Sequence, residues 1–201
     1  NCLLDKGFVS RILTRFYEND KEGVFKHSII GNISFKRFLK KIFLKKSLKR
    51  DEKFEIFTIP LKNSSVLRNK CVKDFDIVHL HWVADLLSVN EITEMTRTKK
   101  VLWTLHDMNP FTGGCHHSDD CVQYVDGCMN CPQLRNEGEK VAEYFKIKKD
   151  AFEKIDDNSL TFISPSKWMF EKASESALLK KFRHILIPHF VDANVFKYLE
   201  K

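Results

Sequence analysis

Strand-like and helix-like segments alternate along this chain from residue 55 onward, and this alternation restricts the possible folds more than any other feature. Short runs rich in apolar and β-branched residues predict strands over 55–59, 76–82, 101–105, 160–163 and 185–187. A capping box at Ser88 and Glu91 predicts a helix to about residue 98, apolar spacing predicts another over 141–155, and Ser166 can cap a third. Strand–helix–strand units with short connections predict an α/β fold, in which helices cover both faces of a parallel sheet.

The composition agrees with a globular domain. Hydrophobic residues make up 43% of the 201 residues, with only 7 Gly and 5 Pro, which excludes disordered, linker-like and collagen-like classes. No stretch approaches the ~18 consecutive apolar residues of a membrane-spanning helix. The chain begins without Met and without a secretory signal pattern, so we expect a cytoplasmic fragment that starts inside an element.

Positive charge is concentrated at the N-terminal end. Residues 1–50 hold 13 Lys and Arg against 4 Asp and Glu, and a helix predicted over 34–50 combines an apolar Phe stripe with most of these lysines. Three interpretations remain open for this basic amphipathic helix: a surface helix with solvated lysines, a helix lying on an anionic membrane surface, or a nucleic-acid contact.

Polar side chains follow the predicted strands at their carboxyl ends. Because the carboxyl ends of parallel strands meet at one edge, where ligands bind in open α/β sheets, we expect a ligand-facing cleft there. The chain has no nucleophile elbow, no P-loop and no Gly-x-Gly-x-x-Gly after a strand, which disfavours a protease or a kinase. The residues at the strand ends are His79, His81 and Trp82, then His106 and Asp107, then Ser164 and Ser166, and finally His189.

Four of the six cysteines lie close together in the predicted Cys-rich loop over 112–134, with the spacing Cys-x5-Cys-x6-Cys-x2-Cys. Four thiolates can form a closed tetrahedral zinc site, which would be structural because no position stays open for catalysis. Two disulfides or free, redox-active thiols are the alternatives, and His116, His117 or Asp119 could replace one sulfur. The expected ligands are Cys115, Cys121, Cys128 and Cys131.

Several motifs resemble bacterial group-1 (family 4) glycosyltransferases, particularly the branch that builds capsular, exopolysaccharide or lipopolysaccharide sugars. The resemblance rests on Asp-Ile-Val-His-Leu-His-Trp at 76–82, on Trp-Thr-Leu-His-Asp at 103–107 joined to the cysteine loop, and on Ile-Ser-Pro-Ser-Lys-Trp at 163–168. The run Ile-Pro-His-Phe-Val-Asp at 187–192 resembles the crossing between the two domains of these enzymes.

The resemblance implies the N-terminal half of a GT-B enzyme, with a Rossmann-like sheet. Residues 1–198 would form a partial acceptor-binding domain whose first strand precedes residue 1, and 187–201 would start the interdomain crossing. The donor domain would follow residue 201, so this part by itself would be inactive. The implied reaction, of hexosyltransferase type, moves a sugar from a nucleotide-sugar to a glycan or lipid-linked acceptor, with retention and without a catalytic metal.

Carried over residue by residue, His106 matches the histidine that reaches the transferred sugar. His81 matches the strand end nearest the acceptor, Asp107 would orient His106 or the loop, and Ser164 and Ser166 would line the same edge. A lipid-linked acceptor would place the protein at the inner face of the cell membrane, where the basic helix could contact anionic lipid.

Two other functions compete with a transferase. One is a zinc-knuckle nucleic-acid-binding module that uses the Lys-rich helix, and the other is an inactive scaffold descended from a transferase. No Lys or Arg lies between Cys115 and Cys131, whereas a loop that grips phosphates needs cations. We therefore expect no nucleic-acid partner.

Overall fold

The computed structural model describes residues 6–15, 22–27, 56–60, 64–134, 138–192 and 195–196. The helix predicted over 34–50 lies outside these ranges. In chain order, the α-helices and strands are β1 (Ile12–Thr14), β2 (Val24–Lys26), α2 (Lys70–Lys73), β3 (Ile77–Leu80), α3 (Val89–Thr96), β4 (Lys100–Thr104), α4 (Gly138–Phe152), β5 (Leu160–Ser164), α5 (Lys167–Glu175) and β6 (Arg183–Leu186). Short 3-10 helices lie at η2 (Val66–Arg68), η3 (Asn109–Phe111) and η4 (Gln123–Val125).

The main sheet has four parallel strands in the order β3–β4–β5–β6. Each strand pairs with the next one along the chain, and a helix lies between consecutive strands, which confirms the predicted α/β fold. The register sets Val101 opposite Leu160 and Trp103 opposite Phe162. All four of these side chains lie on one face of the sheet and are buried, whereas Leu102 and Thr161 on the opposite face are half-buried.

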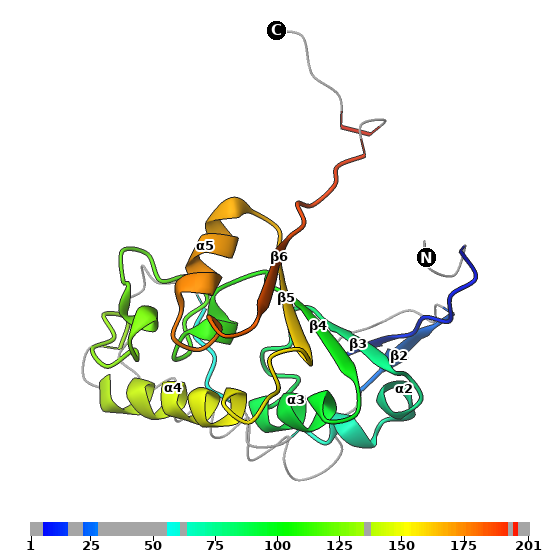
Figure 1. The fold of residues 1–201 in the computed structure, drawn as a ribbon, viewed down its shortest axis with the longest axis horizontal. Coiled ribbons are helices and arrows are strands. Elements are labelled where there is room, and N and C mark those ends of the chain that lie inside the picture. Colours follow the sequence, from blue (N-terminus) through cyan, green and yellow to red (C-terminus); the bar gives the residue numbers. More distant parts are fainter. Residues whose placement is uncertain are drawn as a thin grey trace, which may run out of the picture.

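The helices α3 and α5 begin at their predicted caps, whereas α4 spans Gly138–Phe152 in place of the predicted 141–155. Ser88 and Glu91 form the predicted capping box of α3, and the Ser166 hydroxyl accepts a hydrogen bond from the Met169 N–H at the start of α5. In Figure 1, α3 and α4 lie side by side, and α5 lies against β5 and β6. The helices α4 and α5 pack on the same face of the sheet, because Trp103 contacts Phe152 of α4 while His184, on the same face of β6, contacts Phe170 of α5. The chain after β6 runs away from the sheet.

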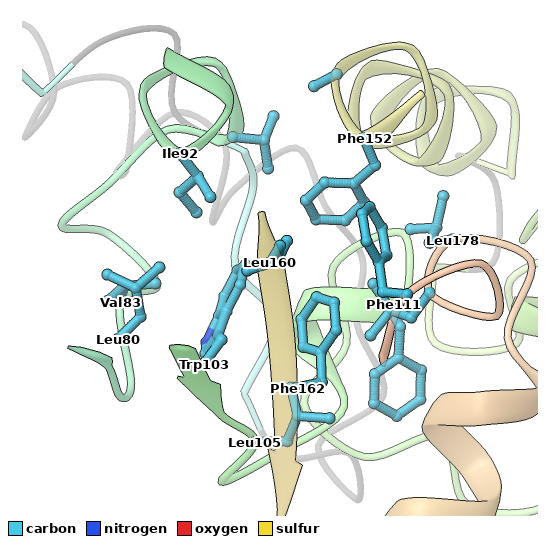
Figure 2. Packing of buried hydrophobic residues seen from close by; sticks show 14 of the residues in the cluster. Leu80, Val83, Ile92, Trp103, Leu105, Phe111, Phe152, Leu160, Phe162 and Leu178 are labelled. Carbon is cyan, nitrogen blue, oxygen red and sulfur yellow. The ribbon is translucent and has the colours of Figure 1, made fainter. Parts of the chain in front are cut away.

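The core is one continuous cluster that lies between the sheet and its helices. Figure 2 shows Trp103 of β4 between Leu80 and Val83 on one side and Leu160 and Phe162 on the other. Edge-on aromatic contacts extend the cluster, because Phe152 of α4 contacts Trp103 at 6.5 Å between ring centroids. The same cluster holds Phe111 and Tyr124, so residues of the cysteine loop pack into the main core.

Two features differ from the sequence-based expectations. The strand predicted over 55–59 does not join the sheet in the described residues 56–60, where Phe57 instead forms a single antiparallel bridge with Cys115. Pro60 removes a backbone donor at this point, so a longer ladder is disfavoured. A short parallel pair, β1 and β2, forms in a polar segment whose sequence shows little periodicity. Within the described part of the chain, no helix is long and apolar enough to span a membrane.

Candidate functional site

The ends of β3 and β4 bring three histidines into contact. The His79 Nε2 atom lies 2.8 Å from the Thr104 hydroxyl, and the His79 and His81 rings are 4.3 Å apart between centroids. The His81 Nδ1 atom lies 3.0 Å from the His106 Nε2 atom, so one of the two imidazoles donates and the other accepts. His189, which follows β6, stacks on His106 at 5.7 Å. The structure thus brings the strand-end histidines together as the parallel topology predicts.

This cluster favours neutral imidazoles. Burial, together with the other imidazoles of the cluster, lowers the pKa of His79, His81 and His106 below the ordinary value of 6.5. Asp107 opposes this effect at His106 but does not outweigh it. The neutral form dominates at pH 7, so each ring offers one N–H donor and one acceptor nitrogen to a ligand.

The Asp107 carboxylate joins β4 to the cysteine loop. Its Oδ2 atom accepts hydrogen bonds from the Trp82 indole and from the His116 Nδ1 atom, both at 2.6 Å, and its Oδ1 atom accepts from the Asn109 N–H at 2.9 Å. The buried His116 ring continues the network to the Thr58 hydroxyl at 2.8 Å. Asp107 therefore holds the loop and the Trp82 ring, and within the described ranges its carboxylate does not hydrogen-bond to His106.

Trp82 gives the strand-end edge an exposed aromatic face. Its side chain is 54% exposed although its only polar atom is bonded to Asp107. A small cavity of about 10 Å³ opens between the indole and the histidines. Its polar lining residues are His81, Trp82, Thr104, His106, Asp107 and Asn109.

The two predicted serines have different surroundings. Ser166 is exposed and its hydroxyl caps α5, so its oxygen is already used by a backbone donor. Ser164 is fully buried at the end of β5, and within the described residues its hydroxyl has no hydrogen-bond partner. Its backbone carbonyl accepts from the Ile187 N–H and extends the pairing of β5 with β6.

The cysteine loop is fastened against residues 56–58. The Thr58 N–H donates to the Gly114 carbonyl at 2.8 Å, and the His116 N–H donates to the Ile56 carbonyl at 3.2 Å. Gly114 has a φ of 153°, and a Cβ atom there would lie 2.5 Å from the Phe57 ring. Glycine is needed at this position because both the backbone conformation and the close approach exclude a side chain.

The four cysteines of the loop surround one small cavity. Cys115 and Cys128 are buried, and Cys121 and Cys131 are half-buried. Burial raises the pKa of the Cys115 thiol to about 11 and that of Cys128 to about 12. Such thiols are poor nucleophiles, unlike redox-active cysteines, whose pKa is lowered. The five cysteines in the described ranges are free thiols, and no three or more His, Cys, Asp or Glu side chains there form a group already arranged to hold a metal ion.

Lys148 of α4 lies beside this loop. Its side chain is fully buried, and its ammonium group donates to the backbone carbonyls of Asn109 and Thr112, the latter at 2.9 Å. Burial lowers the pKa of Lys148 to about 8, an effect that Cys115, Cys128 and Asp107 partly offset. The sequence places Lys148 on the mostly apolar face of its helix, but does not indicate what it contacts. The sequence names His116 only as a possible replacement for a cysteine ligand, whereas the structure places its ring nitrogens on Asp107 and Thr58.

Comparison with known proteins gives a partial relationship. The chain is 31% identical over 104 residues to a protein of Escherichia coli (strain K12) named as a colanic acid biosynthesis glycosyl transferase, WcaC. The match covers 48% of this chain and 25% of the relative, so the chain spans about a quarter of the length of the curated relative it matches. No family model and no solved structure matches the chain. The chain is therefore related to a glycosyltransferase over about half of its length.

Proposed function

We propose that the described sheet is the acceptor-side half of a GT-B glycosyltransferase that builds cell-surface polysaccharide. The observation that carries this proposal is the hydrogen-bonded pair His81–His106, which lines a cavity at the carboxyl edge of a parallel sheet. The partial similarity to a glycosyltransferase of polysaccharide biosynthesis supports the same reaction class. The donor would be a nucleotide-sugar, and the acceptor a glycan or a lipid-linked glycan.

His106 is the residue that we assign to the transferred sugar. Its Nε2 atom faces His81, and in the described part of the chain no hydrogen bond occupies its Nδ1 atom, so this atom is available to a sugar hydroxyl. A neutral imidazole can donate or accept such a bond without adding charge to the site. His81 positions His106, because the bond between them determines which tautomer His106 adopts.

The proposed transfer retains the configuration of the sugar. An acceptor hydroxyl oxygen forms a bond to the anomeric carbon, while the bond from that carbon to the nucleoside diphosphate breaks. The leaving diphosphate takes up the proton of the acceptor hydroxyl. No catalytic metal is needed in this scheme, and His106 acts by orienting the sugar rather than by taking a proton.

We also propose that the protein acts at the cytoplasmic face of the membrane. The basic segment 34–50 supports this location, because clustered Lys and Arg bind anionic lipid headgroups. A lipid-linked acceptor would be presented at the same surface. Sedimentation with vesicles of anionic phospholipid, compared with neutral vesicles, tests this part of the proposal at low and high salt.

The transfer is tested with the full-length protein, including the donor domain that the resemblance implies after residue 201. This protein is incubated with a panel of nucleotide-sugars and with lipid-linked glycans, and release of nucleoside diphosphate is measured. We expect acceptor-dependent release that His106→Gln reduces by ~100-fold or more, since this loss matches removal of one well-placed polar group. His117→Gln is the matched control, because His117 is an exposed histidine that does not line the cavity. Equal activity of both variants would contradict the role of His106, and salt-sensitive binding to generic DNA without any turnover would favour the nucleic-acid alternative.

A further inference from the structure

The four cysteines of the loop and a buried cation lie together, away from the histidine cavity. The cavity that Cys115, Cys121, Cys128 and Cys131 line has a volume of about 10 Å³, which is enough for one atom-sized guest. The loop reaches this arrangement through its own packing, because Tyr124 is buried in the core and the Gly113 N–H points at a cysteine sulfur.

A second observation is that the Lys148 ammonium is buried without a paired carboxylate among the described residues. It donates to two neutral carbonyls instead. Asp107 is in electrostatic range, but its two oxygens already accept three hydrogen bonds. The other charged or chargeable neighbours of Lys148 are Cys115 and Cys128. A buried cation is costly unless an anion compensates it, so an anionic cysteine cluster would remove this imbalance.

A hydrogen-bond donor at one of the sulfurs points the same way. The Gly113 N–H donates to the Cys128 sulfur at 3.4 Å. A backbone donor aimed at sulfur stabilises a thiolate, and outer-shell donors of this kind orient the ligands of metal sites.

We propose that this cavity binds one Zn²⁺ ion through the thiolates of its four cysteines, and that the Lys148 ammonium balances part of the charge. On binding, the four thiols release four protons to solvent and form four zinc–sulfur bonds, which leaves a dianionic centre beside Lys148. The side chains must rotate toward the cavity to reach coordinating distance. Zinc is the preferred ion because four sulfur ligands suit its tetrahedral geometry. The site is structural, and it stands independently of the proposed sugar transfer.

The first experiment needs no variant. The purified protein, prepared in zinc-containing medium without a metal-affinity step, is analysed by inductively coupled plasma mass spectrometry. We expect about one zinc per chain, and Co²⁺ exchange should give the sulfur-to-cobalt charge-transfer and visible bands of a tetrahedral thiolate site. Absence of bound metal, iron in place of zinc, or a mass decrease that indicates two disulfides would each overturn the proposal.

Variants then test which cysteines bind zinc and whether Lys148 contributes to zinc affinity. Cys128→Ser and Cys131→Ser should lose the zinc, whereas Cys71→Ser should keep it, because Cys71 does not line the cavity. Lys148→Met should weaken zinc binding by ~10- to 100-fold, the usual effect of removing an outer-shell partner. Lys146→Met is the control, since Lys146 is exposed on the same helix and pairs with Asp150. Unchanged zinc affinity in a folded Lys148→Met protein would show that Lys148 does not balance the site.

Discussion

The Oδ2 atom of Asp107 lies 2.6 Å from the Nδ1 atom of His116 and thereby ties the end of β4 to the cysteine loop. The two residues belong to different segments of the chain, one at the strand edge and one in the loop. Their contact fastens the loop to Asp107, a residue that lines the histidine cavity.

Asp107→Asn is expected to destabilise the protein. An amide has one acceptor oxygen, so it cannot serve both the Asn109 N–H and the pair formed by Trp82 and His116. We expect a loss of ~1–3 kcal/mol in the free energy of unfolding, measured with urea, since a buried donor is left unpaired. Asp126→Asn, an exposed position of the same loop, should change it little.

The histidine cluster is expected to make stability depend on pH. Because the pKa of His79, His81 and His106 is lowered in the folded state, the unfolded chain takes up protons first as the pH falls. The stabilising effect is therefore present above about pH 6.5 and is lost as the pH falls through the folded pKa values. Thermal denaturation from pH 8 to pH 5 should show this decrease in Tm.

The variant His189→Asn tests whether His189 helps to lower the pKa of His106. His189 stacks on His106 and is the nearby imidazole that lowers its pKa, so its removal should raise the pKa of His106 toward 6.5. Titration of the imidazole C–H resonances by NMR measures this value directly. A pKa of His106 that does not move would show that burial accounts for the shift without His189.

Trp82→Ala is expected to weaken acceptor binding if the proposed transfer is correct. The exposed indole face offers an apolar platform for a sugar ring, and its N–H bond to Asp107 keeps the ring in place. We expect the KM for the acceptor to rise about tenfold, corresponding to ~1.4 kcal/mol. The KM of Trp82→Phe should lie between that of the native protein and that of Trp82→Ala. Trp168→Ala removes an exposed tryptophan outside the cavity and should leave KM unchanged.

Gly114→Ala is expected to cost more stability than Gly127→Ala. The new methyl group at 114 would meet the Phe57 ring at 2.5 Å and the Thr58 carbonyl at 2.9 Å, whereas the nearest atom at 127 is 3.8 Å away. We expect a loss of ~2 kcal/mol or more at 114 and less than ~1 kcal/mol at 127, from urea denaturation. Similar losses at both positions would contradict the close packing of residues 56–58 on the loop.

Glu91→Gln is expected to destabilise α3 only near neutral pH. Burial alone would raise the pKa of Glu91, but hydrogen bonds from Ser88 and Ser64 outweigh it, so the pKa lies below the ordinary value of 4.5. The carboxylate therefore stabilises the fold above about pH 4.5, and this contribution is lost as the pH falls through the folded pKa. The difference in unfolding free energy from the native protein should be ~1–2 kcal/mol at pH 7 and shrink below pH 4. Glu143→Gln, on the exposed face of α4, is the control.

Most of the α/β framework could be predicted from the sequence because its determinants are local. Apolar runs mark β3 to β6, and Ser88, Glu91 and Ser166 mark the starts of α3 and α5. The meeting of His81 with His106 also follows, since parallel strands end at one edge. The pair β1 and β2 could not be predicted, because two three-residue strands carry too few residues to show a period.

The parallel sheet, its helices and the edge at which the histidines gather follow from the amino-acid sequence alone. The reason is that the periods of strands and helices are patterns of residues close together in the chain. Only the tertiary structure decided what Asp107 and Lys148 contact. Asp107 bonds to Trp82 and His116, which lie 25 and 9 positions away, and Lys148 reaches carbonyls 39 and 36 positions away. Such contacts depend on how the loops pack on the folded sheet. A local pattern of residues does not show which residues far apart in the sequence come into contact.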